Sequence, residues 1–364
     1  MRKIIFTLAK FAISAGIIGY LVYDAQRDQT FSNLASQPKH WGILAAATVV
    51  CLTAVMLTFV RWFVLVRALE LPFSLKDAFR LGFLGYLLNF VSLGAVGGDL
   101  FKAVFVAREQ HGRRAEAVAT VVLDRVVGLY MLFVLATAAI LATGQLHSPV
   151  EQIAIICQGT LVCTAAGAAG IAVLLIPGVT QGAFSAFLQR LPRIGPLFGK
   201  LLGAIRIYRR RPGMLALACA LSAAVHSLSA TGIWLVSKGL PGEAPSLADH
   251  FVIVPLSLVT GVLPLPVNGM GAFEAVVAFL YQRIPVGLEV AEGRGLVVAL
   301  GYRAITILIA MVGVCYYLAS RREVAQVLEE AEREQELEER EQTHGESVEE
   351  RFVHPELNRG AAQA

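Results

Sequence analysis

Long runs of apolar residues are the main feature of this 364-residue sequence. Six of them reach about the 20 residues that an α-helix needs to cross a bilayer. They cover residues 4–23, 41–65, 117–142, 153–176, 214–236 and 295–318. The first run is too long for the apolar region of a signal peptide, and no small-residue cleavage site follows it. The pattern therefore predicts six membrane-spanning helices, the first of them retained.

Two further regions are apolar but interrupted by residues that break helices. In the first, residues 78–93 are followed by a glycine-rich break and then by residues 100–107. In the second, residues 247–262 are followed by a Pro/Gly-rich break and then by residues 271–282. At 1.5 Å per residue each arm is about 12–24 Å long, less than the ~30 Å hydrocarbon core. Such a break at membrane depth is tolerated only where protein or a wet cavity covers it.

The basic residues predict how the chain is oriented. Clusters of Lys and Arg follow every second apolar segment, whereas the loops 24–40, 143–152 and 239–250 are nearly bare. The positive-inside rule then puts both termini in the cytoplasm. The clusters are Arg2, Lys3 and Lys10; Arg61, Arg67, Lys76 and Arg80, which we expect to follow the second span; Lys102, Arg108, Arg113 and Arg114; the basic residues from Arg190 to Arg211; and Arg321 with Arg322.

This orientation holds only if the broken regions, about residues 74–110 and 247–283, make no net crossing of the membrane. We therefore expect an all-α, polytopic membrane helix bundle in which each region is a re-entrant helical hairpin. One hairpin enters from each face, as in the inverted repeats of secondary transporters. A pair of thin full spans in each region keeps the same loop orientation, and this alternative stays open.

The composition agrees with a membrane protein and separates two parts of the chain. Hydrophobic residues make up 56% and charged residues 16%, whereas soluble chains carry about a quarter charged residues. From Glu323 onward there are 13 acidic and 4 basic residues. We predict an integral membrane domain over residues 1–322 and an acidic cytoplasmic tail over 323–364, helical at first and then disordered. The basic loops indicate topology and contact with anionic lipids, and no nucleic-acid binding is expected.

The first break carries an aspartate that could bind a ligand. Gly97 and Gly98 allow a sharp turn, and Asp99 and Lys102 follow them. We expect Asp99 to cap the next helix by accepting hydrogen bonds from backbone N–H groups. The amides of that helix N-terminus also form a natural seat for a phosphate.

Two charged residues lie in the apolar run that follows. Asp124 and Arg125 must face protein or water, because a charge at the centre of a spanning helix costs about 2.5–3.5 kcal/mol on insertion scales. Adjacent helical residues do not face each other, so these two do not pair. We expect Arg125 to pair with Asp99, 26 positions earlier, or with a lipid phosphate. The alternative is that the helix begins late and leaves both charges near the headgroups.

The second break repeats this arrangement. Gly269 and Gly271 loosen the turn, Asn268 offers a side-chain amide, and Glu274 supplies a carboxylate. Tyr302-Arg303 follows in the last apolar run, and Arg303 could reach Glu274 or bind an anionic substrate through two hydrogen bonds. A purely structural buried ion pair is the alternative.

Motifs for other chemistries are absent from the sequence. The chain has no His-Glu-x-x-His zinc motif, no Ser-His-Asp-like set and no phosphate-binding Walker loop. Its five cysteines lack the spacing of metal ligands. Gly269-x-Gly271-x-x-Glu274 resembles half of a dinucleotide-binding fingerprint, but no strand precedes it. We therefore predict no metal and no cofactor, and an enzymatic activity is not favoured.

At these residues the chain resembles the lysylphosphatidylglycerol synthase transmembrane-region family, the flippase-like module of multiple peptide resistance factors and their stand-alone relatives. The matching stretches are residues 89–102, with Gly-Gly-Asp-x-x-Lys; 122–128, with Asp-Arg-x-x-Gly; 263–274, with Gly-x-Gly-x-x-Glu; and 301–303. Lys102 stands where the family pattern usually has Arg, and Asp124 where it usually has Glu. No soluble synthase domain follows residue 322 in this sequence, so lipid synthesis is not implied.

The resemblance implies a protein of the bacterial inner membrane that moves a phospholipid or an isoprenoid-type lipid between leaflets. Its expected partners are membrane lipids, while a homo-oligomer and a cytoplasmic partner of the acidic tail stay open. An intramembrane lipid-modifying transferase and a non-catalytic scaffold are the rival functions. The residues expected to bind substrate are Gly97, Gly98, Asp99, Lys102, Asp124, Arg125, Asn268, Gly269, Gly271, Glu274, Tyr302 and Arg303.

Overall fold

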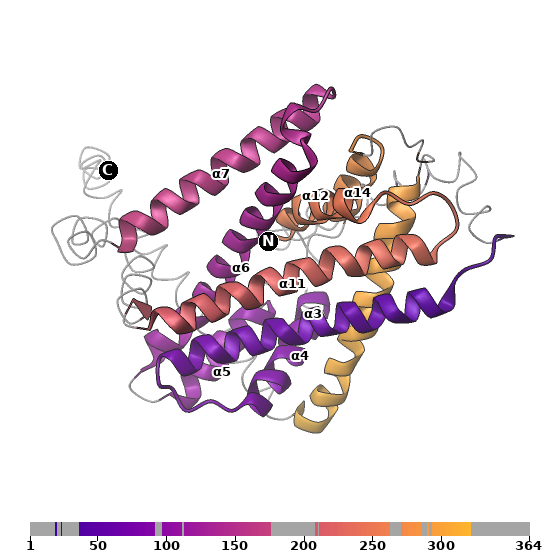
Figure 1. Ribbon diagram of the computed structural model, residues 1–364. Coiled ribbons are helices and arrows are strands. Elements are labelled where there is room, and N and C mark those ends of the chain that lie inside the picture. Colours follow the sequence, from indigo (N-terminus) through magenta and orange to yellow (C-terminus); the bar gives the residue numbers. More distant parts are fainter. Residues whose placement is uncertain are drawn as a thin grey trace, which may run out of the picture.

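A computed structural model describes most of the predicted membrane domain (Figure 1). The described residues are 36–91, 97–110, 113–175, 211–262, 271–284 and 293–321, with single residues at 19, 23, 208, 209 and 290. All regular elements within these ranges are helical, which confirms the all-α class. The predicted span over 4–23, apart from two of its residues, lies outside the described residues. So do the centres of both breaks and the tail from 323 onward.

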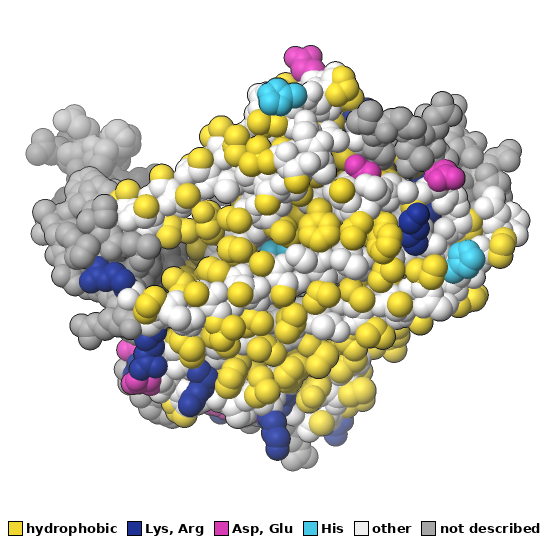
Figure 2. Space-filling model, in the orientation of Figure 1, with side chains coloured by type: hydrophobic (Ala, Val, Ile, Leu, Met, Phe, Trp, Pro, Cys, Tyr) yellow, Lys and Arg dark blue, Asp and Glu magenta, His cyan; other side chains and the backbone are white. Residues whose placement is uncertain are grey.

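Five helices are long and apolar enough to cross a membrane, which confirms five of the six predicted spans. They are α3 (Trp41–Ala68), α6 (Arg114–Thr143), α7 (Glu151–Leu175), α11 (Pro212–Gly239) and the helix Arg294–Arg321. Their large apolar side chains are often exposed: Trp41 is 72% exposed and Leu318 is 64% exposed. In Figure 2 such side chains cover a broad band, whereas most Lys and Arg side chains gather along one edge. This distribution fits a multi-pass membrane protein.

Helices α3 and α11 lie antiparallel along their full length and form the spine of the bundle (Figure 1). At one end the backbone N–H of His40 donates to the carbonyl O of Gly239 over 3.0 Å. Closer to the same end, a Cβ added to Gly232 would lie only 2.5 Å from Sγ of Cys51. A glycine at this point lets the two backbones approach closely, as small residues do between membrane helices.

Four short helices correspond to the arms of the two interrupted regions. They are α4 (Leu75–Val91), α5 (Gly98–Glu109), α12 (Leu247–Leu258, continued by the 3-10 turn η2, Val259–Val262) and α14 (Ala272–Tyr281). Even the longest, with 17 residues, extends only about 26 Å at 1.5 Å per residue. Each is therefore shorter than the ~30 Å hydrocarbon core, as the sequence predicts.

The two short pairs pack at opposite ends of the spine. Helices α4 and α5 share a hydrophobic core with the C-terminal part of α3 and the first half of α6. Helices α12 and α14 share a second core with the N-terminal part of α3, the C-terminal part of α11 and the helix Arg294–Arg321. The two cores adjoin in the C-terminal half of α3, where Trp62 belongs to the first core and Phe59, with Phe83 of α4, belongs to the second. The pair α4 and α5 and the pair α12 and α14 lie toward different ends of the α3–α11 spine (Figure 1).

One residue lies elsewhere than the sequence predicts. Arg61 was counted with the basic residues that follow the second span, although it lies inside the apolar run 41–65; in the structure it is part of α3 and is buried, 5% exposed. Asp124 of α6 and Ser222 of α11 bind its guanidinium, so the charge is satisfied within the helix bundle.

Candidate functional site

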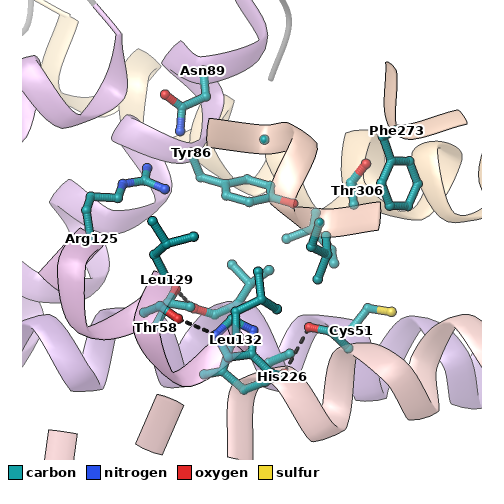
Figure 3. A pocket seen from close by; sticks show the side chains of 18 of the residues that line it. Cys51, Thr58, Tyr86, Asn89, Arg125, Leu129, Leu132, His226, Phe273 and Thr306 are labelled. Atoms are coloured by element: carbon teal, nitrogen blue, oxygen red, sulfur yellow. Dashed lines mark hydrogen bonds between the residues drawn. The ribbon is translucent and has the colours of Figure 1, made fainter. Parts of the chain in front are cut away.

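A cavity of about 690 Å³ lies where the two short pairs meet the long helices. Both halves of the chain line it: Asp99 and Arg125 from the first, and Phe273, Tyr302 and Arg303 from the second. In Figure 3, Arg125 and Asn89 lie on one side, Phe273 and Thr306 on the other, and Tyr86 between them. The two candidate charge centres of the sequence thus share one space.

Glycines bring α4 and α5 together at the first charge centre. The N–H of Gly98 donates to Oδ1 of Asn89 over 2.9 Å. A Cβ on Gly98 would overlap the backbone carbonyl of Gly85 on α4. Gly98 therefore permits a close approach of two backbones, and this approach fixes where α5 begins.

Asp99 occupies the first turn of α5 and serves as an ion-pair partner. Its predicted capping role is wrong, because Gly97 is the N-cap residue and the side chain that accepts from the first N–H of α5, that of Gly98, is Asn89. Oδ2 of Asp99 accepts a hydrogen bond from Nε of Arg125, and Nζ of Lys102 lies 3.6 Å from Oδ1. Two cations bind this carboxylate, so Asp99 acts as an ion-pair partner and not as the cap of α5.

The predicted pairing of Arg125 with Asp99 is confirmed, and this pair is open to the cavity. The side chain of Arg125 is 58% exposed and that of Asp99 is 35% exposed. Figure 3 shows the guanidinium of Arg125 extending beside Asn89. Because the pair uses only one of the five N–H donors of the guanidinium, an anion in the cavity could be bound by the others.

Asp124 does not line the cavity and pairs with Arg61, which does. Nε and Nη2 of Arg61 donate to the two carboxylate oxygens over 2.7 and 2.9 Å, and Nη1 donates to Oγ of Ser222 over 2.9 Å. This network ties α3, α6 and α11 together. The alternative of a late start for α6 is wrong, because the helix begins at Arg114, ten residues before Asp124.

The second charge centre is closed. Gly271 has a φ of +91°, which favours glycine, and its N–H donates to Oε2 of Glu274 over 2.7 Å. Nε and Nη2 of Arg303 both reach the other oxygen, Oε1, at 2.8 and 2.7 Å. Glu274 is 0% exposed, and the guanidinium of Arg303 also lies 5.6 Å from the ring centre of Phe273. Both oxygens of this carboxylate are therefore occupied.

The sequence-predicted residues fall into three groups. Gly97, Asp99, Arg125, Tyr302 and Arg303 line the cavity. Gly98, Lys102, Asp124, Gly271 and Glu274 contact other residues of the site or shape its turns. Asn268 and Gly269 lie outside the described residues.

Other lining residues were not among the predicted set. Arg61 could have been found as the one arginine inside the run 41–65. His226 lies in an apolar run, and its Nε2 is 2.9 Å from the carbonyl O of Gly128. Asn89 begins the stretch 89–102 that carries the family resemblance, whereas Tyr86 has no sequence signal that separates it from ordinary helix residues. Within the described ranges, no group of three or more His, Cys, Asp or Glu side chains could hold a metal ion.

The model of the family described as lysylphosphatidylglycerol synthase TM region matches residues 7–313, which include both charge centres and all cavity-lining residues. No curated protein matches the chain.

Proposed function

The chain belongs to the lysylphosphatidylglycerol synthase TM region family, and from this premise we propose that it moves a lipid with a phosphate-bearing headgroup between membrane leaflets. One observation carries the proposal. Two carboxylate–arginine pairs, each joining the first turn of a short helix to the next long helix, meet at one cavity.

In this proposal Arg125 binds the phosphate. Its guanidinium is exposed, and the side-chain amide of Asn89 lines the same cavity. Both groups can donate hydrogen bonds to phosphate oxygens. Apolar side chains such as Leu129, Leu132 and Val225 line other parts of the cavity. The headgroup would occupy the cavity while the acyl chains stay in the surrounding lipid.

The proposed route uses the two short helix pairs as re-entrant hairpins, one open to each leaflet. Two features support it: the pairs pack toward different ends of the spine formed by α3 and α11, and their charge centres differ in exposure. Asp99–Arg125 is open to the cavity and Glu274–Arg303 is closed. Exchange of these two states would expose the site to each leaflet in turn.

The proposed location is a bacterial inner membrane with both termini in the cytoplasm. The exposed Arg67, Arg113 and Arg114 lie at the end of the bundle where α3 ends and α6 begins. The positive-inside rule assigns such an end to the cytoplasm. Membrane lipids are the proposed partners.

A leaflet-resolved transport assay tests this function. The purified protein is reconstituted in liposomes that contain a fluorescent phosphatidylglycerol, and the fraction of label in the outer leaflet is followed by chemical quenching. The wild-type protein should speed exchange between leaflets, and Arg125→Gln and Arg303→Gln should each slow it at least about tenfold, the effect of losing ~1.4 kcal/mol of binding. Arg114→Gln, a matched change at the exposed start of α6, should have little effect.

The same assay separates the rival functions. Unchanged transport in folded Arg125→Gln and Arg303→Gln proteins would refute the proposed site. A new lipid species in the extracted lipids would favour a transferase. Loss of function only after removal of residues 323–364 would favour a scaffold that acts through its acidic tail.

A further inference from the structure

The charges around the cavity do not cancel. Arg61 and Asp124 form one neutral pair, and Arg303 and Glu274 form another. Asp99, however, is shared by two cations, Lys102 and Arg125. With His226 counted as neutral, the described site has one positive charge in excess. The adjoining segments 92–96 and 263–270 contain no ionisable residue in the sequence, so they do not alter this balance.

Lys102 is placed to neutralise Asp99 without reaching the ligand. Its side chain is 13% exposed, and it is not among the residues that line the cavity. Its Nζ lies 5.5 Å from the ring centre of Trp62 and 6.0 Å from that of Phe59, where the ring faces attract a cation. A Cβ at Gly85 would lie 2.7 Å from Cε of Lys102, so this glycine makes room for the lysine.

We propose that Lys102 is a specificity-determining residue that makes the cavity prefer a lipid headgroup with a net charge of −1, as in a phosphodiester without an amine. The proposal rests on the function proposed above and names its substrate class. With Lys102 beside it, Asp99 keeps a cationic partner when Arg125 turns to a phosphate. Without Lys102, the same phosphate would leave Asp99 as an unpaired carboxylate next to a second anion, and the two would repel each other.

A lipid displacement assay tests this selectivity. The full-length protein in detergent micelles is loaded with a tail-labelled fluorescent phosphatidylglycerol. The label is then displaced by unlabelled phosphatidylglycerol (charge −1), phosphatidylethanolamine (0) or lysylphosphatidylglycerol (+1). For the wild-type protein we expect phosphatidylglycerol to displace at a concentration at least about tenfold lower than the other two, which corresponds to ~1.4 kcal/mol.

The variants change this preference in opposite directions. Lys102→Met keeps an apolar chain against Trp62 but removes the charge, so the preference should fall to about threefold or less. Lys102→Arg should retain it. Asp99→Asn removes the negative charge and should increase the preference for phosphatidylglycerol. Lys76→Met, at the exposed start of α4, is the matched control and should behave as the wild type.

The outcomes separate this proposal from the proposed function. If the label does not bind the wild-type protein, lipid binding itself fails. If it binds but the three lipids displace it equally, the charge preference is overturned while lipid binding stands. A folded Lys102→Met protein with full preference would overturn the role of Lys102. If that variant does not fold, Asp99→Asn decides, because an unchanged or smaller preference contradicts the charge balance.

Discussion

Replacement of Arg61 by methionine should strongly destabilise the bundle. Arg61 donates two hydrogen bonds to Asp124 and one to Ser222, and both Arg61 and Ser222 are buried. Methionine has a similar unbranched stem and preserves part of the packing, so the lost interaction is mainly electrostatic. Asp124 would keep its charge while losing the guanidinium that satisfies both of its oxygens.

The expected magnitude follows from the burial of the pair. Removal of one partner of a buried ion pair costs about 3–5 kcal/mol, because the other charge is left unpaired. The side chain of Asp124 is 14% exposed and Arg61 borders the cavity, so water can partly solvate the orphaned carboxylate. We therefore expect the lower end, about 3 kcal/mol. Arg61→Met combined with Asp124→Leu should recover most of this loss, since no unpaired charge remains.

The assay is a double-mutant cycle on the free energy of unfolding in detergent. The cycle includes the wild type, Arg61→Met, Asp124→Leu and the double variant, with Arg67→Met at the exposed end of α3 as the matched control. The coupling energy should be at least about 1.5 kcal/mol, within the range for residues of one network. A loss below about 0.5 kcal/mol for Arg61→Met, the size of ordinary surface changes, would refute the assignment of this ion pair.

Three further substitutions test local geometry, each by the midpoint of thermal unfolding in detergent. Gly98→Ala should cost about 1–3 kcal/mol because its Cβ meets the backbone of Gly85, and an unchanged midpoint would contradict the close approach of α4 and α5. Gly271→Ala should cost about 1–3 kcal/mol because its φ is +91°; an equal cost for Gly213→Ala, where a Cβ meets nothing, would contradict this cause. Ser246→Ala should cost about 1 kcal/mol by removing the cap of α12, whereas Ser246→Thr, which keeps the hydroxyl that faces Asp249, should preserve stability.

The sequence predicts the long helices well because membrane-spanning segments follow a simple physical rule. A continuous apolar run must be a helix in lipid, since no water is present to satisfy its backbone. The pairing of Asp99 with Arg125 follows from a similar argument, because a charge inside an apolar segment needs a partner. Both inferences depend on the surrounding lipid rather than on the detailed packing of the helices.

The other ion-pair partners in the site depend on contacts that no local sequence pattern specifies. Arg61 pairs with Asp124, 63 positions away, and no local spacing rule links them. Other basic residues after the same run made a loop position for Arg61 the simpler prediction. Asp99 has the sequence context of a helix cap, yet its carboxylate binds two nearby cations instead of the backbone amides. Local chemistry identified the carboxylate but could not identify its partners.

The two charge centres are built from the same kinds of group, but separating the arginine from the carboxylate costs more free energy in one than in the other. Glu274 is fully buried and has one oxygen on the Gly271 N–H and the other on Arg303, so departure of Arg303 would leave a buried charge without a cationic partner. Asp99 is 35% exposed and would retain Lys102 if Arg125 left. An anion that enters the cavity therefore displaces a carboxylate from Arg125 at a lower cost than from Arg303. The difference arises from one lysine and from water access, although both centres pair the same kinds of group.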